Sequence, residues 1–529
     1  MNAARLRALV IPLIVAAVCL RSLFSPGYLH QVDVSFGPRA TGVTWNFYAP
    51  VQIFFGALAR ILGAAVAGRV YAFGALFLAA SAPMVLFRRS SWFVQCTAGL
   101  LGVLNPFVYD RMVEGQWGVV VAAACLFLWL DAWEEMQARP GIKSAARLSG
   151  IGILAVAFDV HAVGFLVLLF VVGGLGRKVW RQPAQLKWTA AAIGLSAGIL
   201  LYGIIPFFML HNQTTYSAVQ DFGRTDFATF RSVADQQYGL VPNLIGLYGY
   251  WGEGLGRFPV ANQGAPWWPA SAGTLTAAAL VGAWLSRRHA WLLLSGILAL
   301  AVSASSAIPG GIDAATRFAA HVPLIAAYRE PQKWSAVWLL ALVVLSMRGV
   351  DFLSARLGHD GPRGFVAPSL AFVLALAAIL PAGRSEVRYL PSIVRPVSYP
   401  ADWYRTADSL RRNVSEESAV VVLPWHKYLT FPFTGGRLIL NPAPTFFPGH
   451  ILVSQDIEIG SRPPVDPIGR AARGYAQGQC ALAESIRKAN ARWVVVLDSP
   501  EGRENAQTLI ACGFSIAEGR VGVSLLLHA

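Results

Sequence analysis

The sequence has few charged residues: Asp, Glu, Lys and Arg make up only 13% of its 529 residues, whereas 55% are hydrophobic. Soluble domains carry roughly 25% charged residues. Together with a mean hydropathy of +0.51, this scarcity excludes a protein that is water-soluble over most of its length. The composition predicts a chain solvated mainly by lipid.

The sequence also lacks any Lys/Arg-rich run, although its formal net charge is +15. The basic residues stand singly or in pairs between apolar segments. This is the pattern of short cytoplasmic loops in a multispanning protein. We therefore expect membrane lipids, and no nucleic acid, among its partners.

Cysteine is scarce, with five residues at no metal-binding spacing. Cys19, Cys96 and Cys125 lie in apolar stretches and are interpreted as packing residues. Cys480 and Cys512 share the C-terminal region and can pair if that region faces an oxidising compartment; the sequence leaves this open. No cofactor is indicated, and a divalent metal is possible but not signalled.

No small-residue cleavage site follows the N-terminal apolar run, which is interpreted as a retained anchor. Arg5 and Arg7 place the N-terminus in the cytoplasm and residues 22–50 outside. If residues 51–68 lie along the outer interface as an amphipathic helix, every later basic loop falls inside. The other predicted spans are 69–87, 92–108, 116–131, a hairpin of two short helices over 147–178, 187–208, 270–286, 290–306, 335–348 and 366–382.

These segments make about eleven spans and leave the C-terminus outside. Beyond them, short valine-rich runs at 418–426 and 491–500 alternate with amphipathic stretches, which is typical of an α/β domain. The fold class predicted is mostly α, a polytopic membrane protein with a C-terminal extracytoplasmic α/β domain. The predicted domains are 1–382 and 383–529.

On this topology the unusual polar residues gather outside the membrane. Asp33, beside His30 in "LHQVDVSFGP", is either a helix cap or a general base or metal ligand at the lipid boundary. In "YDRMVEGQW", Arg111 either pairs with Glu114 one helical turn away or holds an anionic head group. Asp110 adds a further carboxyl group there.

The stretch "YREPQKW" raises the same choice. Arg329 and Lys333 flank Glu330 and Pro331, and a helix that begins after this proline would favour an anion at its N-terminus. Structural salt bridges and a phosphate-bearing substrate are both compatible with these residues.

Other candidates are weaker. His161, at the apex of the predicted hairpin, is a turn residue or a ligand. Trp251 belongs to a long loop, 209–268, whose aromatic residues are either interfacial anchors or a stacking surface for a sugar or lipid chain. Trp425 and His426 follow a predicted strand, where α/β domains place ligand contacts.

These features resemble the GT-C superfamily of prokaryotic membrane glycosyltransferases. The likeness consists of the aspartate-bearing loop after the first span, the membrane-parallel helix, the hairpin "FDVHAVGFLVLLF", the motifs "NPFVYDRMVEGQW" and "YREPQKW", and a soluble domain after the last span. It covers most of the membrane region, and the C-terminal domain contributes nothing to it.

The resemblance implies a sugar donor on a polyprenyl phosphate and inverting transfer on the outer face of the inner (plasma) membrane. The acceptor would be an envelope polysaccharide, glycolipid or glycoprotein. Asp33 would be the general base, and Arg111, Arg329 and Lys333 would face the leaving phosphate. A second acidic residue near Asp33 is lacking, so Asp110, Glu114 or Glu330 would supply it. A flippase for lipid-linked glycans and a non-catalytic assembly protein are the alternatives.

Overall fold

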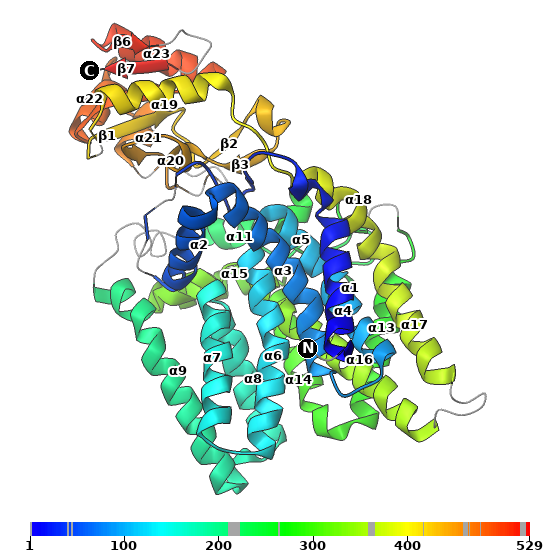
Figure 1. The fold of residues 1–529 in the computed structure, drawn as a ribbon. Helices are drawn as coiled ribbons and strands as arrows, with labels where there is room; N and C mark the ends of the chain where they lie inside the picture. The colour runs from blue at the N-terminus through cyan, green and yellow to red at the C-terminus, as the bar shows by residue number, and fades with distance from the viewer. Residues whose placement is uncertain are drawn as a thin grey trace. The chain divides into compact units, whose positions relative to one another are not determined.

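The computed structural model, drawn in Figure 1, is a helical membrane region followed by a mixed α/β region. Its contacts divide the chain into two units. The membrane unit comprises residues 1–22, 43–54 and 70–394, and the second unit comprises 23–42, 55–69 and 395–529. The residues described are 3–39, 42–43, 46–209, 223–262, 265–357, 365–415, 417–456, 458, 464, 466–476, 478–518 and 525–528.

Helices occupy the segments predicted as spans, and the chain is a multi-pass membrane protein. Among the described residues, six helices are long and apolar enough to cross a bilayer, or seven if the bent pair α4 and α5 is one span. The predicted total of about eleven stays a prediction. The main helices are α1 (Ala3–Cys19), α2 (Ala49–Leu62), α3 (Ala64–Leu86), α4 (Trp92–Val103), α5 (Pro106–Glu114), α6 (Trp117–Ala138), α7 (Ile142–Phe158), α8 (Ala162–Gly176), α9 (Pro183–Met209), α13 (Trp268–Leu285), α14 (Trp291–Ala304), α15 (Gly311–His321), α16 (Ser335–Leu357), α17 (Val366–Ala378) and α18 (Arg384–Ile393).

Three local differences from the sequence prediction have clear causes. The predicted interfacial helix 51–68 ends early, because Gly63 takes a φ of 88° between α2 and α3. The segment that contains Arg111 is a buried helix, α5, rather than a loop. Asn105 caps it by accepting from the Val108 N–H at 3.0 Å, and Gly115 ends it with a φ of 85°. The last predicted span continues past residue 382 through α18.

The predicted hairpin is confirmed as two short helices, α7 and α8, that meet at Asp159–His161. Helix α16 is the best-buried long helix after α6, with 78% of its apolar window inside the protein. Helix α13 packs against α16 at very short range: a Cβ on Gly282 would lie 1.8 Å from the carbonyl oxygen of Leu345. Small residues allow such close helix contacts in membranes.

In the second unit, the predicted α/β structure is confirmed by a mixed five-stranded sheet with the order β4-β1-β5-β7-β6. The parallel pairs are β1 with β4 and with β5, and β7 runs antiparallel to both its neighbours. Two helical layers cover it: α19 and α20 belong to one apolar core, and α22 and α23 to the other. The elements are α19 (Ala401–Asn413), β1 (Ala419–Leu423), β2 (Tyr428–Thr430), β3 (Leu438–Leu440), α20 (Ala443–Phe446), β4 (His450–Leu452), α21 (Pro467–Ala472), α22 (Ala481–Lys488), β5 (Ala491–Val496), α23 (Pro500–Ala511), β6 (Ser515–Glu518) and β7 (Leu525–His528).

A disulfide joins Cys480 to Cys512. Cys19 and Cys125 are buried free thiols, in keeping with a packing role, and Cys96 is partly buried. The contact-based units change at residues 394/395 after the last membrane helix, and the sequence-based boundary at 382/383 stays a prediction.

Candidate functional site

The two ends of α6 carry different kinds of charge. This helix has 22 residues, about 33 Å of helix, which is close to the thickness of the hydrocarbon core. At its C-terminal end, Asp131 pairs with Arg88 and Arg147, and Glu134 pairs with His289 and Arg348. Arg88, Arg147 and Arg348 are among the basic residues predicted to be cytoplasmic, and each has a carboxylate to neutralise it.

The other end of α6 adjoins a set of buried polar residues that we call the ionic cluster. Glu330 is its centre. Its Oε2 atom lies 3.5 Å from the Arg111 guanidinium and accepts from the side-chain N–H groups of Gln116 at 3.2 Å and Trp251 at 3.4 Å. Its Oε1 atom lies 3.6 Å from the Lys333 ammonium. The ionic cluster comprises Arg111, Gln116, Asp159, His161, Trp251, Glu330 and Lys333.

Lys333 connects Glu330 to the apex of the α7–α8 hairpin, since its Nζ atom lies 3.5 Å from Oδ2 of Asp159. The Oδ1 atom of Asp159 lies 2.6 Å from Nδ1 of His161. Burial would raise the pKa of both Asp159 and Glu330. Nearby positive charge, that of Lys333 foremost, outweighs burial, so the pKa of Asp159 falls below its usual range and the pKa of Glu330 falls to about 2.

Burial, and after it the charge of Lys333, lowers the pKa of His161, which favours the neutral imidazole. A neutral imidazole that donates from Nδ1 to Asp159 has an acceptor at Nε2. That nitrogen is buried and has no hydrogen-bond partner among the described residues. An unsatisfied buried acceptor is costly, so a ligand hydroxyl at this position would stabilise the site.

Local structure positions each member of the ionic cluster. Arg111 is 1% exposed, donates to Gln116 at 2.6 Å and lies 4.2 Å above the Tyr250 ring. Pro331 begins a 3-10 turn, Pro331–Trp334, that leads into α16, so the expected proline-initiated turn is confirmed. This turn presents Lys333 one helical turn after Glu330.

The remaining membrane-unit candidates lie around the cluster. Glu114 pairs with Arg257 at 2.9 Å. Arg329 stacks over the Phe230 ring at 4.8 Å. Asp110 is 1% exposed, and neither of its carboxyl oxygens accepts a hydrogen bond from the described residues.

Trp251 is 5% exposed, and its neighbours Tyr248 and Tyr250 are buried as well. The alternative of exposed interfacial anchors is therefore wrong for these three residues, because Trp251 and Tyr250 contact Glu330 and Arg111 of the ionic cluster and Tyr248 packs on the Trp268 ring. Trp267 is 43% exposed, as an interfacial anchor would be. The part of the long loop at 210–222 lies outside the described residues.

The other sequence candidates belong to the second unit. Asp33 is exposed near the tip of a small hairpin whose strands bridge His30 and Ser35. The carbonyl of Gln31 accepts from the Leu440 N–H at 2.9 Å, which ties the hairpin to β3. His30 is fully buried, with Nδ1 2.9 Å from the Ser35 hydroxyl, and burial lowers its pKa to about 3.

A second polar group forms where β1 ends, as expected for the Trp425–His426 segment. His426 lies between two carboxylates, with Nδ1 3.0 Å from Glu458 and Nε2 2.7 Å from Glu501. Hydrogen bonds to these groups raise the pKa of His426 to about 9. Trp425 is buried and donates to Asp466 at 3.0 Å.

Sequence reasoning missed several members of the site. Asp159 was not among the sequence candidates, although its position two residues before His161 was a usable signal. Arg257 and Glu253 lie in the long loop that was noted for its aromatic residues alone. No group of three or more His, Cys, Asp or Glu side chains suited to a metal ion occurs in the described part of the chain.

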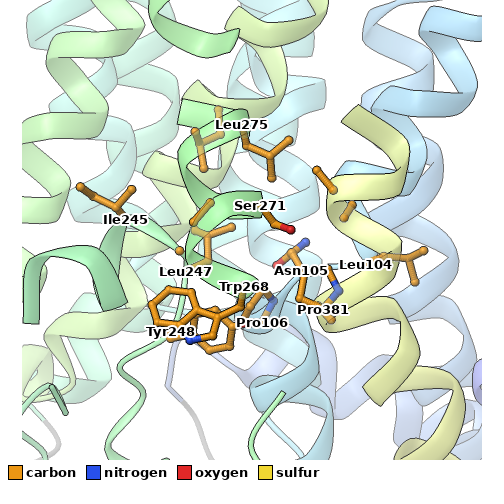
Figure 2. A pocket seen from close by; sticks show the side chains of 16 residues that line it. Leu104, Asn105, Pro106, Ile245, Leu247, Tyr248, Trp268, Ser271, Leu275 and Pro381 are labelled. Atoms are coloured by element: carbon orange, nitrogen blue, oxygen red, sulfur yellow. The ribbon is translucent and has the colours of Figure 1, made fainter. Parts of the chain in front are cut away.

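A small cavity lies between α4–α5, α13 and the last membrane helix and is shown in Figure 2. Its volume is about 30 Å³, little more than room for one water molecule. The side chains of Asn105 and Ser271 are the polar groups among mostly apolar neighbours. Such a gap is too small for a sugar or a prenyl phosphate.

No family model and no curated protein matches this sequence. Solved structures do match. Arabinofuranosyltransferase AftD from Mycobacteria superposes with a TM-score of 0.59 and 14% identity over 99% of this chain, and a mutant form with a TM-score of 0.60 and 14% identity, also over 99%. ArnT from Cupriavidus metallidurans in the apo state superposes with a TM-score of 0.51 and 15% identity, over 99% of this chain and 98% of its own.

The chain has the GT-C fold. It spans 40% of the AftD chain and 41% of the mutant form, so AftD contains much that has no counterpart here. At 14–15% identity the likeness concerns the GT-C fold, and the chemistry of the site has to be argued from this chain's own residues.

Proposed function

We propose that this chain is a glycosyltransferase that moves a sugar from a polyprenyl-phosphate donor to an acceptor outside the cytoplasm. The observation that carries the proposal is the ionic cluster. Buried Arg111 and Lys333 come from different helical segments and face the same carboxylate, Glu330, at 3.5 and 3.6 Å. Those separations are longer than direct charged hydrogen bonds of about 2.8 Å, so both cations keep donor capacity for a phosphate.

The chemistry needs this arrangement. The acceptor hydroxyl attacks the anomeric carbon, the bond from that carbon to the phosphate oxygen breaks, and the sugar is transferred with inversion. The departing prenyl phosphate gains negative charge, which Arg111, Lys333 and the nearby Arg329 would stabilise. A structure of ArnT has undecaprenyl phosphate bound, and a polyprenyl phosphate is the lipid that the proposed transfer would release.

Asp33 is the proposed general base, because its side chain is exposed to water, the phase from which the acceptor hydroxyl would arrive. The proposed topology puts the N-terminus in the cytoplasm and the second unit outside the inner membrane. The matched ion pairs at one end of α6 support that orientation. Envelope polysaccharide, glycolipid and glycoprotein acceptors remain the proposed acceptor classes.

The experiment is a transfer assay with the full chain in proteoliposomes. The donors are polyprenyl-phosphate sugars, beginning with the arabinofuranose form, and the acceptor is an envelope glycan extract. We expect a covalently extended acceptor, and we expect Asp33→Asn to lower the rate by about 10²–10⁴-fold. The matched control is Asp408→Asn, an exposed aspartate of the second unit, which should keep full activity. Full activity in Asp33→Asn would remove Asp33 as the base.

A transporter of lipid-linked glycans is the second candidate, since it would use the same phosphate contacts. A transporter would move the lipid-linked glycan across the bilayer without forming a covalent product, and that outcome would overturn the glycosyltransferase proposal.

A further inference from the structure

A cavity of about 650 Å³ lies in the membrane unit between residues 233 and 268. This volume falls within the range of about 300–1,000 Å³ typical of small-molecule sites, and it is far larger than the gap in Figure 2. No residue that lines it, within the described ranges 233–262 and 265–268, is Lys or Arg. The cavity therefore differs in chemistry from the ionic cluster and is unsuited to a phosphate.

The lining is rich in groups that bind hydroxyls. Four amide side chains and two carboxyl groups face the space, alongside two aromatic residues. Amides and carboxylates together offer both donors and acceptors, which a neutral sugar ring with many hydroxyls requires. These polar residues are Asp235, Gln236, Gln237, Asn243, Glu253 and Asn262.

One of these groups is buried without a partner. Asn243 is 2% exposed, and its Nδ2 atom donates to the Val233 carbonyl at 2.9 Å. Its Oδ1 atom accepts no hydrogen bond from the described residues. A buried acceptor without a hydrogen bond costs free energy, and this one belongs to a residue that lines the cavity.

The aromatic wall is fixed in place. Trp268 is 4% exposed and contacts Tyr238 edge-to-face with ring centroids 5.6 Å apart. Trp268 also lines the small gap on the α13 side, where Figure 2 shows it beside Tyr248. The small exposed part of this rigid indole lines the cavity and offers an apolar contact for the C–H groups of a sugar ring.

The cavity shares a wall with the ionic cluster. The short 3-10 helix Trp251–Leu255 directs Trp251 to Glu330 at 3.4 Å and Glu253 to the cavity. Burial raises the pKa of Glu253 to about 7, so near neutral pH its carboxyl group can donate as well as accept. The Asp235 side chain is held as well, because its Oδ1 atom accepts from the backbone N–H groups of Gln237 and Tyr238 at 2.8 Å.

We infer that this cavity binds an uncharged sugar residue of the acceptor glycan, held by Asn243, Glu253 and the Trp268 ring. The inference rests on the proposed function, because that function places the donor phosphate across the Trp251–Leu255 helix. The sugar attached to the donor is the alternative source of the same chemistry, and the test below separates the two.

The test uses the full chain in detergent and saturation-transfer NMR with the methyl glycosides of arabinofuranose, galactose, mannose and glucose. The signal is measured without donor lipid and again with saturating polyprenyl-phosphate sugar: a signal that persists reports an acceptor-type sugar, and a signal that is displaced reports the donor's sugar and overturns the inference. Gly254→Phe fills the cavity: a Cβ there lies 3.6 Å from Val233 Cγ2, an ordinary contact. The matched control is Gly150→Phe, on the exposed face of α7 with no atom within 4 Å.

At least one methyl glycoside should bind to the wild type and to Gly150→Phe and should lose about tenfold or more in affinity in Gly254→Phe and Glu253→Gln. Exposed Gln182→Ala should have no effect. Equal binding in all variants, or no binding of any glycoside without donor lipid, overturns the inference. Binding of undecaprenyl phosphate is measured in parallel. Its persistence in Gly254→Phe separates failure of the cavity inference from failure of the proposed function.

Discussion

The Nζ atom of Lys333 lies 3.5 Å from the Oδ2 atom of Asp159. One residue precedes α16, and the other ends α7, so this contact joins two helical segments that are far apart in the chain. Lys333 also faces Glu330 at 3.6 Å. A buried ammonium between two carboxylates is a structural element and a candidate phosphate ligand at once, and variants at this position must separate the two roles.

Lys333→Met removes one charge-assisted hydrogen bond, worth about 1.5–3 kcal/mol. We expect undecaprenyl phosphate to bind about tenfold to a hundredfold more weakly, as measured by native mass spectrometry. The single variant also leaves carboxylates unpaired, which costs about 3–5 kcal/mol of stability. The double variant Lys333→Met/Glu330→Gln removes one charge of each sign and should fold more stably while still binding the lipid weakly. Lipid binding at wild-type strength in the double variant would exclude Lys333 as a ligand.

Gly282→Ala should destabilise the membrane unit. The added Cβ would lie 1.8 Å from the Leu345 carbonyl oxygen, so α13 and α16 have to move apart. Gly273→Ala in the same helix α13 meets no atom within 4 Å and is the matched control; it should be neutral or stabilising by up to about 1 kcal/mol. Thermal unfolding in detergent measures both. Equal melting temperatures would contradict the close contact of these helices.

The stability of the second unit should depend on pH through His426. Its pKa is raised to about 9 in the folded chain, against about 6.5 for an unfolded histidine. The stabilisation is therefore fully present below pH 6.5 and is lost as pH rises through 9. The melting temperature of the wild type should therefore fall as the pH rises from about 6.5 to 9. The melting temperature of His426→Gln should fall less over the same range. If the melting temperatures of the two proteins fall equally with pH, the ion pairs of His426 with Glu458 and Glu501 contribute nothing to the stability of this unit.

Much of the fold was predictable because its signals are local. Apolar length identified the membrane helices, and valine-rich runs with flanking prolines identified β1 and β5. The proline of "YREPQKW" correctly indicated a helical turn. The structure of α5 was missed because its nine residues have little net hydrophobicity, and its burial comes from contacts with segments far away in the sequence.

The partners within the site were not predictable from spacing. Arg111 and Glu114 suggested a pair one turn apart, whereas the ion pairs formed are Arg111 with Glu330 and Glu114 with Arg257. Such contacts depend on how helices that are distant in the sequence pack together, and residue spacing within one segment does not indicate that packing. The choice for Trp251 between an interfacial anchor and a stacking surface was likewise left open, because its burial depends on the same tertiary contacts.

The most direct test is a cryo-EM structure of the full chain with undecaprenyl phosphate. The account predicts density for the phosphate within hydrogen-bond distance of Lys333 and Arg111, with the prenyl chain leading away between membrane helices. Density for the phosphate at any other place, with Lys333 and Arg111 still bound only to their carboxylates, would contradict it.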